Sequence, residues 1–107
     1  MTVIIAPRAI EQIAEVLYKT RVEYGEKKER KYSELVEAAL HVLSENPRIG
    51  KPCTEVHPDA WTYHIGNWGK KARHLFLYRI REAVEVARFL YDAMDLPRHW
   101  PEEWHAT

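Results

Sequence analysis

Apolar residues recur with two different periods along the chain. Up to about residue 45 they return every three or four positions, the spacing of one face of an α-helix, and after residue 60 the spacing approaches two. The clearest stripe predicts a helix from Glu26 to Glu45 with one apolar face. Its apolar positions are Tyr32, Leu35, Val36, Ala39, Leu40 and Leu43. We therefore expect helices in the first half of the chain and strands in the second.

Turn-forming residues set the limits of the predicted helices. The β-branched run from Thr2 to Ile5 predicts a short strand. Pro7 suits the first position of a helix, because its missing N–H has no intrahelical partner there in any case. Gly25 ends this helix, and Asn46, which precedes a proline, ends the next one. A break of one residue between two helices predicts an antiparallel helical hairpin.

The remaining segments predict a sheet. Residues 47–60 carry three prolines and a glycine, which predicts a surface loop with one short extended piece at 54–57. Strands are expected at Trp61–Gly66, Arg73–Ile80 and Val84–Tyr91, with turns at Asn67–Ala72 and Arg81–Ala83. The order gives an α+β, two-layer fold: an N-terminal strand, an antiparallel helical hairpin, then a three- to four-stranded antiparallel sheet. We expect residues 1–107 to form a single domain.

Composition narrows the class of protein. Hydrophobic residues make up 46% of the chain and charged residues 30%, which is typical of a globular domain in water. No apolar run approaches the roughly 18 residues of a membrane span, and the N-terminus lacks the basic segment of a signal peptide. The single cysteine, Cys53, excludes an internal disulfide. We therefore expect a cytoplasmic protein with a reduced thiol and no membrane contact.

The formal net charge of zero conceals an uneven distribution. Residues 48–81 carry seven lysines and arginines against two acidic residues, whereas residues 82–107 carry two against six. A basic middle and an acidic end favour a nucleic-acid face, a docking face, or charges that pair within the fold. A broad nucleic-acid surface goes with a clear basic excess, so direct nucleic-acid binding is expected to be weak or absent.

The reactive residue types form no catalytic motif in the sequence. The six histidines show no HExxH or HxH spacing, although His64 and His74 are placed to approach each other across neighbouring strands. We expect no metal and no cofactor. Cys53 lies between prolines with His57 four residues on, and a lone loop cysteine usually lacks both a thiolate-stabilising neighbour and a base.

Arginines are the most informative charged residues of the predicted sheet. Arg73, Arg79 and Arg81 share one parity on their strand, and Arg88 stands between two apolar residues. Arginines that project from a sheet into one concavity bind phosphate or carboxylate groups through two parallel hydrogen bonds. The alternative is that each pairs with a glutamate such as Glu85. Because an unpaired buried arginine is costly, Arg88 is expected to have a partner.

The segment after residue 91 is more apolar than a tail usually is. Its large apolar residues are Met94, Leu96, Trp100 and Trp104. We expect the first three of these to return over the sheet as a hydrophobic clasp at one end of the core. A recognition role for Arg98, His99 and Trp104 is compatible with that clasp.

Taken in order, these features resemble the ParE branch of the ParE/RelE toxin superfamily of bacterial type II toxin–antitoxin systems. The resemblance covers nearly the whole chain, from the first strand and Pro7 through the hairpin to NPRIGKP at residues 46–52. It continues in RHLFLYRI (73–80) and VEVARFLYDAMDLPRHWP (84–101), which are similar to the family's last two strands and closing segment. The resemblance implies a fold in which the first strand lies beside the last.

The superfamily contains two kinds of toxin. RelE-like members cleave mRNA on the ribosome with basic residues and often a C-terminal tyrosine or histidine, whereas ParE-like members act on DNA gyrase and leave cleaved DNA trapped. In the nuclease pattern an arginine stands shortly before the tyrosine of the penultimate strand; here Leu75 takes that place relative to Tyr78. Asp92 and Asp95 also stand where that pattern has positive charge.

The resemblance therefore implies a gyrase inhibitor with no covalent chemistry of its own, neutralised by a ParD-like or other small antitoxin. The expected target-binding residues are Arg73, Arg79, Arg88, Arg98 and Trp100. The antitoxin is expected to lay an amphipathic helix into a groove between the hairpin and the sheet edge. Its candidate contacts are Val22, Tyr24 and Val42.

The alternative is a ribosome-dependent mRNA endonuclease. Its catalytic candidates are Arg73, His74, Arg79, Arg88 and Tyr91. A third possibility is a non-toxic member of the family that survives as a binding module.

Overall fold

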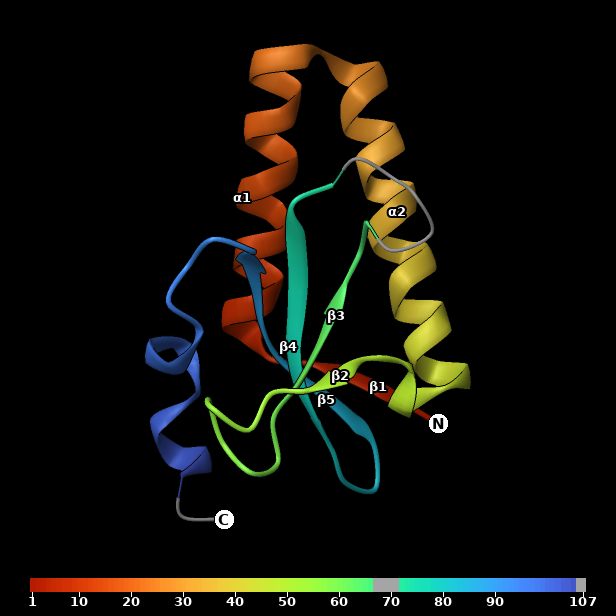
Figure 1. Ribbon diagram of the computed structural model, residues 1–107. Coiled ribbons are helices and arrows are strands. Elements are labelled where there is room, and N and C mark those ends of the chain that lie inside the picture. The colour runs from red at the N-terminus through yellow and green to blue at the C-terminus, as the bar shows by residue number, and fades with distance from the viewer. Residues whose placement is uncertain (67–71, 106–107) are drawn as a thin grey trace.

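The computed structural model describes residues 1–66 and 72–105, in which the chain forms a sheet with two helices on one face (Figure 1). The elements are β1 (Val3–Ile5), α1 (Pro7–Tyr24), α2 (Glu26–Glu45), β2 (Lys51–Pro52), β3 (Trp61–His64), β4 (His74–Ile80) and β5 (Val84–Tyr91). Short 3-10 helices occupy Pro47–Ile49, Leu96–His99 and Glu102–Trp104. The predicted α+β class is confirmed. None of the described helices is long and apolar enough to cross a membrane.

The helical hairpin turns on a single residue. Pro7 begins α1, and Gly25 both follows the end of α1 and precedes α2. Its φ of 94° lies in the left-handed region, which residues with a side chain rarely adopt. Its backbone N–H donates to Arg21 O at 2.8 Å and closes the last turn of α1. The predicted hairpin, with α2 from Glu26 to Glu45, is confirmed.

The sheet is mixed and has five strands in the order β1-β5-β4-β3-β2. β1 runs parallel to β5, with Val3 opposite Val84, and the other three pairs are antiparallel. The expectation that the first strand lies beside the last is confirmed, but the sheet has more strands than predicted and is not purely antiparallel. β2 escaped prediction because two residues show no alternation.

The extended piece predicted at residues 54–57 is wrong. These residues turn instead, and Val56 N–H donates to Cys53 O at 3.0 Å. Pro58 suits such a compact loop because its fixed φ pre-sets the backbone for a turn. The extended pair lies earlier, at Lys51–Pro52, where it pairs with β3.

The strand ends agree with prediction to within two residues. β3 ends at His64, two residues before the predicted Gly66, and β4 begins at His74. The turn at Arg81–Ala83 is confirmed, with Arg81 N–H donating to Ala83 O at 2.9 Å. The predicted turn at Asn67–Ala72 lies outside the described residues apart from its last member.

A β-bulge in β5 changes which side chains face the helices. Between Leu77 and Tyr78 the register with β5 slips by one, and Ala87 becomes an extra residue opposite β4. Because of this bulge, Val86 and Phe89 both belong to the helix-side core although they are three positions apart. Regular alternation would send them to opposite faces.

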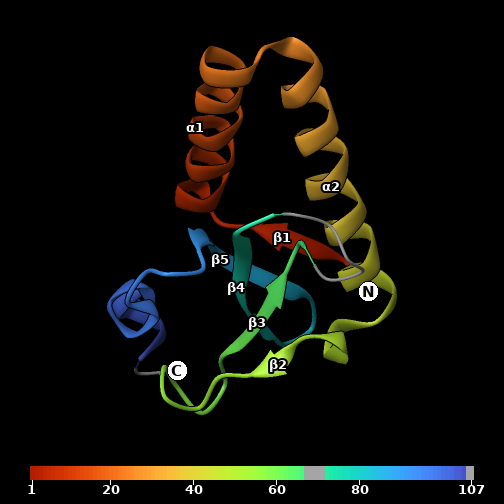
Figure 2. The ribbon, with the colours of Figure 1, turned by 45° about the horizontal axis from the view of Figure 1, so that its top comes forward.

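The sheet carries a hydrophobic core on each face. The buried residues between the helices and the sheet are Ala9, Val36, Ala39, Leu43, Tyr63, Ile65, Ala72, Phe76, Tyr78, Val84, Val86 and Phe89. On the other face, the 53–60 loop and the tail cover the strands. We call this the second core, and its buried residues are Cys53, Val56, Ala60, Leu75, Leu77, Leu90 and Trp100. Figure 2 shows this tail, in blue, beside the end of β5 and away from the hairpin.

Tyr78 fastens the segment after α2 to the sheet. Its hydroxyl donates to Pro47 O at 2.7 Å and accepts from the backbone N–H of Gly50. Burial raises the pKa of Tyr78 to about 12. A Cβ on Gly50 would overlap Thr62 O and this hydroxyl, so the close approach requires glycine.

Candidate functional site

A groove of about 830 Å³ lies between the hairpin and the end of the sheet. α1 borders it with residues spaced four apart, which form one face of the helix along nearly its whole length. These residues are Arg8, Gln12, Val16, Thr20 and Tyr24. Lys28 and Tyr32 of α2 form the facing wall. The end of the sheet and the tail contribute Ala72, Arg73, His74, Phe89, Tyr91, Met94 and His99.

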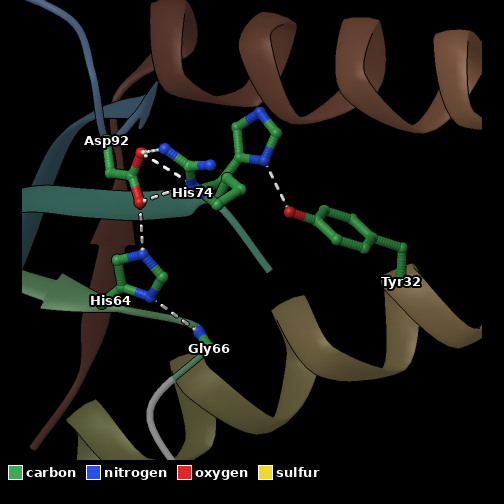
Figure 3. A network of polar contacts seen from close by, with 6 residues as sticks. Tyr32, His64, Gly66, His74 and Asp92 are labelled. Carbon is green, nitrogen blue, oxygen red and sulfur yellow. Dashed lines mark hydrogen bonds and ion pairs between the residues drawn. The ribbon is translucent and has the colours of Figure 1, made fainter. Parts of the chain in front are cut away.

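His74 is held in one protonation form at the base of this groove. Its Nδ1 lies 2.5 Å from the hydroxyl oxygen of Tyr32 (Figure 3). That oxygen accepts a hydrogen bond from the backbone N–H of Arg73, and we assign the tyrosine proton to the contact with Nδ1, which then acts as the acceptor. Burial lowers the pKa of His74, which favours the neutral ring. The ring proton therefore lies on Nε2.

Aromatic contacts fix the plane of the same ring. The His74 ring stacks on Phe89 with 5.1 Å between centroids and meets the edge of Tyr91 at 5.9 Å. The ring therefore has little freedom to turn its Nε2 edge, and no described residue hydrogen-bonds to that atom.

Asp92 connects the ends of three strands. Its Oδ2 lies 2.9 Å from His64 Nε2, and both carboxylate oxygens accept from Arg73 Nε at 3.1 Å (Figure 3). His64 Nδ1 accepts the N–H of Gly66 at 3.0 Å, so Nε2 carries the proton that is donated to Asp92. Arg73, and then His64, lower the pKa of the aspartate. The guanidinium of Arg73 also lies over the ring of Tyr91 at 5.2 Å.

The remaining sheet arginines, Arg79, Arg81 and Arg88, do not line this groove. Arg79 Nε donates to Glu85 at 2.6 Å, which confirms the alternative of an internal pair. The Arg79 side chain is only 12% exposed, and its guanidinium sits 3.8 Å above the ring of Trp104. Arg81 pairs with Asp59 at 3.4 Å.

Arg88 has a partner, as expected, but that partner is a backbone carbonyl and not a glutamate. Its Nη1 donates to the neighbouring Ala87 O at 2.7 Å, and no carboxylate of the described residues lies within ion-pair distance. Burial lowers its pKa, and the charge of Glu103 partly opposes that effect. The arginine is half-buried rather than fully buried, which explains why a carbonyl partner suffices. The four sheet arginines thus form no single concavity.

Residues 3–96 match the family described as ParE toxin of the type II toxin–antitoxin system parDE. The chain belongs to this family. Two curated relatives are the Toxin ParE1 proteins of Mycobacterium tuberculosis strains CDC 1551 / Oshkosh and ATCC 25618 / H37Rv. Each is 26% identical over 98 residues, which cover 90% of this chain and 94% of the relative. The resemblance to ParE toxins is confirmed, and family membership implies a cognate antitoxin as partner.

In this ParE-family toxin the three candidate antitoxin contacts have different surroundings. Tyr24 is 68% exposed and lines the groove. Val22 is 65% exposed but does not line it. Val42 packs against the helix-side core. Only Tyr24 therefore belongs to the groove surface.

The tail combines the two predicted roles in different residues. Trp100 is 4% exposed and packs between His57, with ring centroids 5.1 Å apart, and Trp104 at 5.2 Å. Together with Leu96 it covers the second core, as the clasp interpretation predicts. Met94 was expected over the sheet but lines the groove with 46% of its surface exposed.

Two recognition candidates of the tail, Arg98 and His99, lie near its surface, and His99 lines the groove. Sequence reasoning missed Lys28 and Tyr32 as wall residues, although they stand four apart on one helix face. It also missed the face of α1 that lines the groove, because the helices were predicted from their apolar residues. The available signal was that the polar residues Arg8, Gln12 and Thr20 are separated by multiples of four along that helix.

Cys53 is buried in the second core, where its thiol is not suited to act as a nucleophile. Its thiol donates to Glu55 at 3.2 Å. Burial, followed by the nearby carboxylate, raises the pKa of Cys53 to about 11. The thiol is protonated at neutral pH and is a poor nucleophile. Within residues 1–66 and 72–105, no group of three or more His, Cys, Asp and Glu side chains is placed to hold a metal ion.

Proposed function

We propose that this toxin inhibits DNA gyrase by binding it and trapping cleaved DNA, and that a ParD-like antitoxin neutralises it. The proposal rests first on the match to the ParE family over residues 3–96. The structural observation that supports it most is the tail, which covers the sheet face opposite the helices with Trp100 and Leu96. A folded tail over Arg79 leaves no open basic sheet there for RNA, and this favours a protein target.

The charge balance of the sheet supports the same choice. Arg73 is neutralised by Asp92 and Arg79 by Glu85, and the whole chain has a formal net charge of zero. Of the expected target contacts, Arg73 and Arg98 are exposed, whereas Arg88 is half-buried and Trp100 is buried. We therefore assign target recognition to the exposed pair, with the tryptophan holding the tail in place.

A supercoiling assay with purified gyrase tests the target. At micromolar toxin, relaxed plasmid should remain unsupercoiled, and linear DNA should accumulate after the enzyme is denatured. Arg73→Gln should weaken the effect, and Lys27→Gln, which removes an exposed charge outside the groove, serves as the matched control. Normal supercoiling with no cleaved DNA contradicts the proposal.

One observation favours the mRNA endonuclease as a second candidate. Three of its five catalytic candidates, Arg73, His74 and Tyr91, line one groove. A neutral histidine with its proton on Nε2 can donate a hydrogen bond to a phosphate oxygen and so stabilise the negative charge that develops there. Translation-dependent mRNA cleavage that is lost in His74→Ala would establish this activity. Unchanged cleavage in that variant, or no cleavage by the wild type, would exclude the groove as a nuclease site.

A further inference from the structure

The geometry points to an anchor for an acidic side chain at the base of the groove. We propose that Arg73 and His74 together bind one carboxylate on the amphipathic helix of the antitoxin. This inference rests on the proposed function, because it takes the antitoxin as the occupant of the groove. It adds the chemical group that the groove selects and the residues that select it.

Two chains of hydrogen bonds end in free donors on the same wall. In the first, the N–H of Arg73 binds the Tyr32 hydroxyl, which donates to His74 Nδ1 and leaves Nε2–H for a ligand. In the second, Gly66 orients His64, His64 orients Asp92, and the aspartate takes Nε and Nη2 of the arginine. The Nη1 atom then remains for another acceptor, since no described residue uses it.

Both donors are pre-oriented, which lowers the entropy lost on binding. The histidine ring is stacked on Phe89, and the guanidinium is held against Asp92 and over Tyr91. The Arg73 side chain is 64% exposed despite these contacts. A carboxylate, which accepts at two oxygens, is the group that matches two adjacent N–H donors.

The shape of the groove fits a helix. The lining residues of α1 run from Arg8 to Tyr24, which at the α-helical rise corresponds to a groove roughly 24 Å long. Three of the large apolar residues exposed on this protein, Tyr24, Tyr91 and Met94, lie along it. An amphipathic helix buries its apolar face against such residues.

The charges of the lining favour an acidic partner. Four cationic side chains border the groove: Arg8, Lys19, Lys28 and Arg73. Two acidic ones, Glu15 and Glu23, stand among them. Arg8 pairs with Glu11 and Glu15, and Arg73 pairs with Asp92, so the excess rests on Lys19 and Lys28 against Glu23. This small excess beside apolar residues suits a protein helix with one or a few carboxylates. A nucleic-acid backbone would be rewarded by a broader and more strongly basic surface.

The first test needs only the toxin. In long-range ¹⁵N NMR spectra at neutral pH, His74 should appear as a neutral ring with the proton on Nε2. Tyr32→Phe removes the donor to Nδ1 and should produce a mixture of the two tautomers. A proton on Nδ1 of His74 in the wild type would overturn the proposed anchor without any statement about the partner.

The second test uses the antitoxin encoded beside the gene, identified by growth rescue and co-purification. Each Glu and Asp of that antitoxin is changed singly to its amide, and Kd is measured by calorimetry. One of these amide changes in the antitoxin should weaken binding by about 10- to 100-fold, as expected for a hydrogen bond to a charged group. The toxin variants Arg73→Gln and His74→Phe should each have an effect of the same size. Combining the amide with Arg73→Gln should add little further loss, because both remove the same contact.

Matched controls separate this contact from loss of charge or of histidine in general. Lys27→Gln and His41→Phe change exposed residues outside the groove and should alter Kd by less than about twofold. His74→Gln, whose amide nitrogen can take the place of Nε2, should recover part of the affinity. Circular dichroism of each variant confirms folding before Kd is compared.

The outcomes distinguish the two levels of the hypothesis. If Arg73→Gln and His74→Phe bind the antitoxin with full affinity, the anchor is overturned while the antitoxin remains the partner. The same holds if the loss of binding free energy in Arg73→Gln adds fully to the loss caused by every amide change in the antitoxin. Absence of any co-purifying antitoxin would overturn the proposed function and the anchor with it. If the two variants weaken binding of a duplex DNA or an RNA oligonucleotide and leave the antitoxin Kd unchanged, the site is a phosphate site and the anchor is overturned.

Discussion

The helix side of the sheet leaves polar groups accessible at the end of β4 and β5, whereas the opposite side covers its polar groups with the chain's own tail. At the first site His74 and Arg73 are each held by a partner but keep one donor for another molecule. At the second site Arg79 is paired with Glu85 and covered by Trp104. The same residue type is therefore left accessible on one face and used for packing on the other, depending on what lies above it.

Removal of the tail's main anchor should have the largest effect on this comparison. Trp100→Ala deletes a side chain that is 4% exposed and opens the second core, with an expected loss of about 3–5 kcal/mol in the free energy of unfolding. Urea denaturation followed by circular dichroism measures this. Arg98→Ala, an exposed neighbour in the tail, should change stability by less than about 0.5 kcal/mol. Equal stability of the two variants would show that the tail is not a clasp.

Two tyrosines on the helix side sharpen the comparison. Tyr78→Phe leaves Gly50 N–H and Pro47 O without their buried partner, at an expected cost of about 1–3 kcal/mol in unfolding free energy. Tyr32→Phe removes a half-buried hydroxyl beside the groove and should cost less than about 1 kcal/mol, while it weakens antitoxin binding. Denaturation and calorimetry on both variants should give opposite rankings. The same ranking in both assays would contradict the division between core and groove.

The pH dependence of stability should show a smaller effect. Burial lowers the pKa of His74 below the value of about 6.5 that is usual for a free histidine, so the unfolded chain takes up a proton that the folded chain resists. Stability should therefore fall as pH drops below about 6.5, and this slope should be smaller in His74→Phe than in His41→Phe. Arg73, and after it His64, lower the pKa of Asp92, so the stability that this carboxylate contributes is present above the usual aspartate pKa and is lost at lower pH. Urea denaturation curves between pH 7.5 and 3 measure this dependence, and an unfolding free energy that rises as the pH falls would contradict the prediction.

The smallest effect is expected at Cys53, where the folded protein should hardly react. The thiol pKa of about 11 leaves little thiolate at pH 8. Iodoacetamide should alkylate it rapidly in urea and very slowly in buffer, as measured by mass spectrometry. A Trp100→Ala variant, with the second core opened, should react at an intermediate rate. Rapid reaction of the wild type in buffer would show that the tail does not protect this core.

The sequence determined the elements better than their faces. The helix from Glu26 to Glu45 was predictable because an apolar stripe and two terminators agree. The facing of β5 was not, because the extra residue Ala87 changes parity within the strand and leaves no trace in its composition. The place of β1 beside β5 came only through the family resemblance, and its parallel direction was not predicted, since three residues carry no information on direction.

The candidate site was predicted in part. Arg73, His74 and Tyr91 were named from their strands, and the structure places them on one groove. Their partners Tyr32 and Asp92 could not be assigned from the sequence. The hydrogen bond between Tyr32 and His74 spans 42 positions and depends on how the hairpin packs against the sheet. The separation of Arg79 from Arg73 was also hidden, since it depends on where the tail folds.

Because β1 pairs with β5, the sheet can be completed only late in the synthesis of the chain. Val3 has its partner at Val84, and Ala6 N–H donates to Val86 O at 2.9 Å. A nascent chain that has made only the helices exposes one strand without its neighbour and one apolar face without its sheet. The complete sheet forms only after the last strand leaves the ribosome, and the tail that closes its second face follows later still. A chain truncated before β5 therefore lacks the strand that joins β1 to β4, and it should yield no folded toxin.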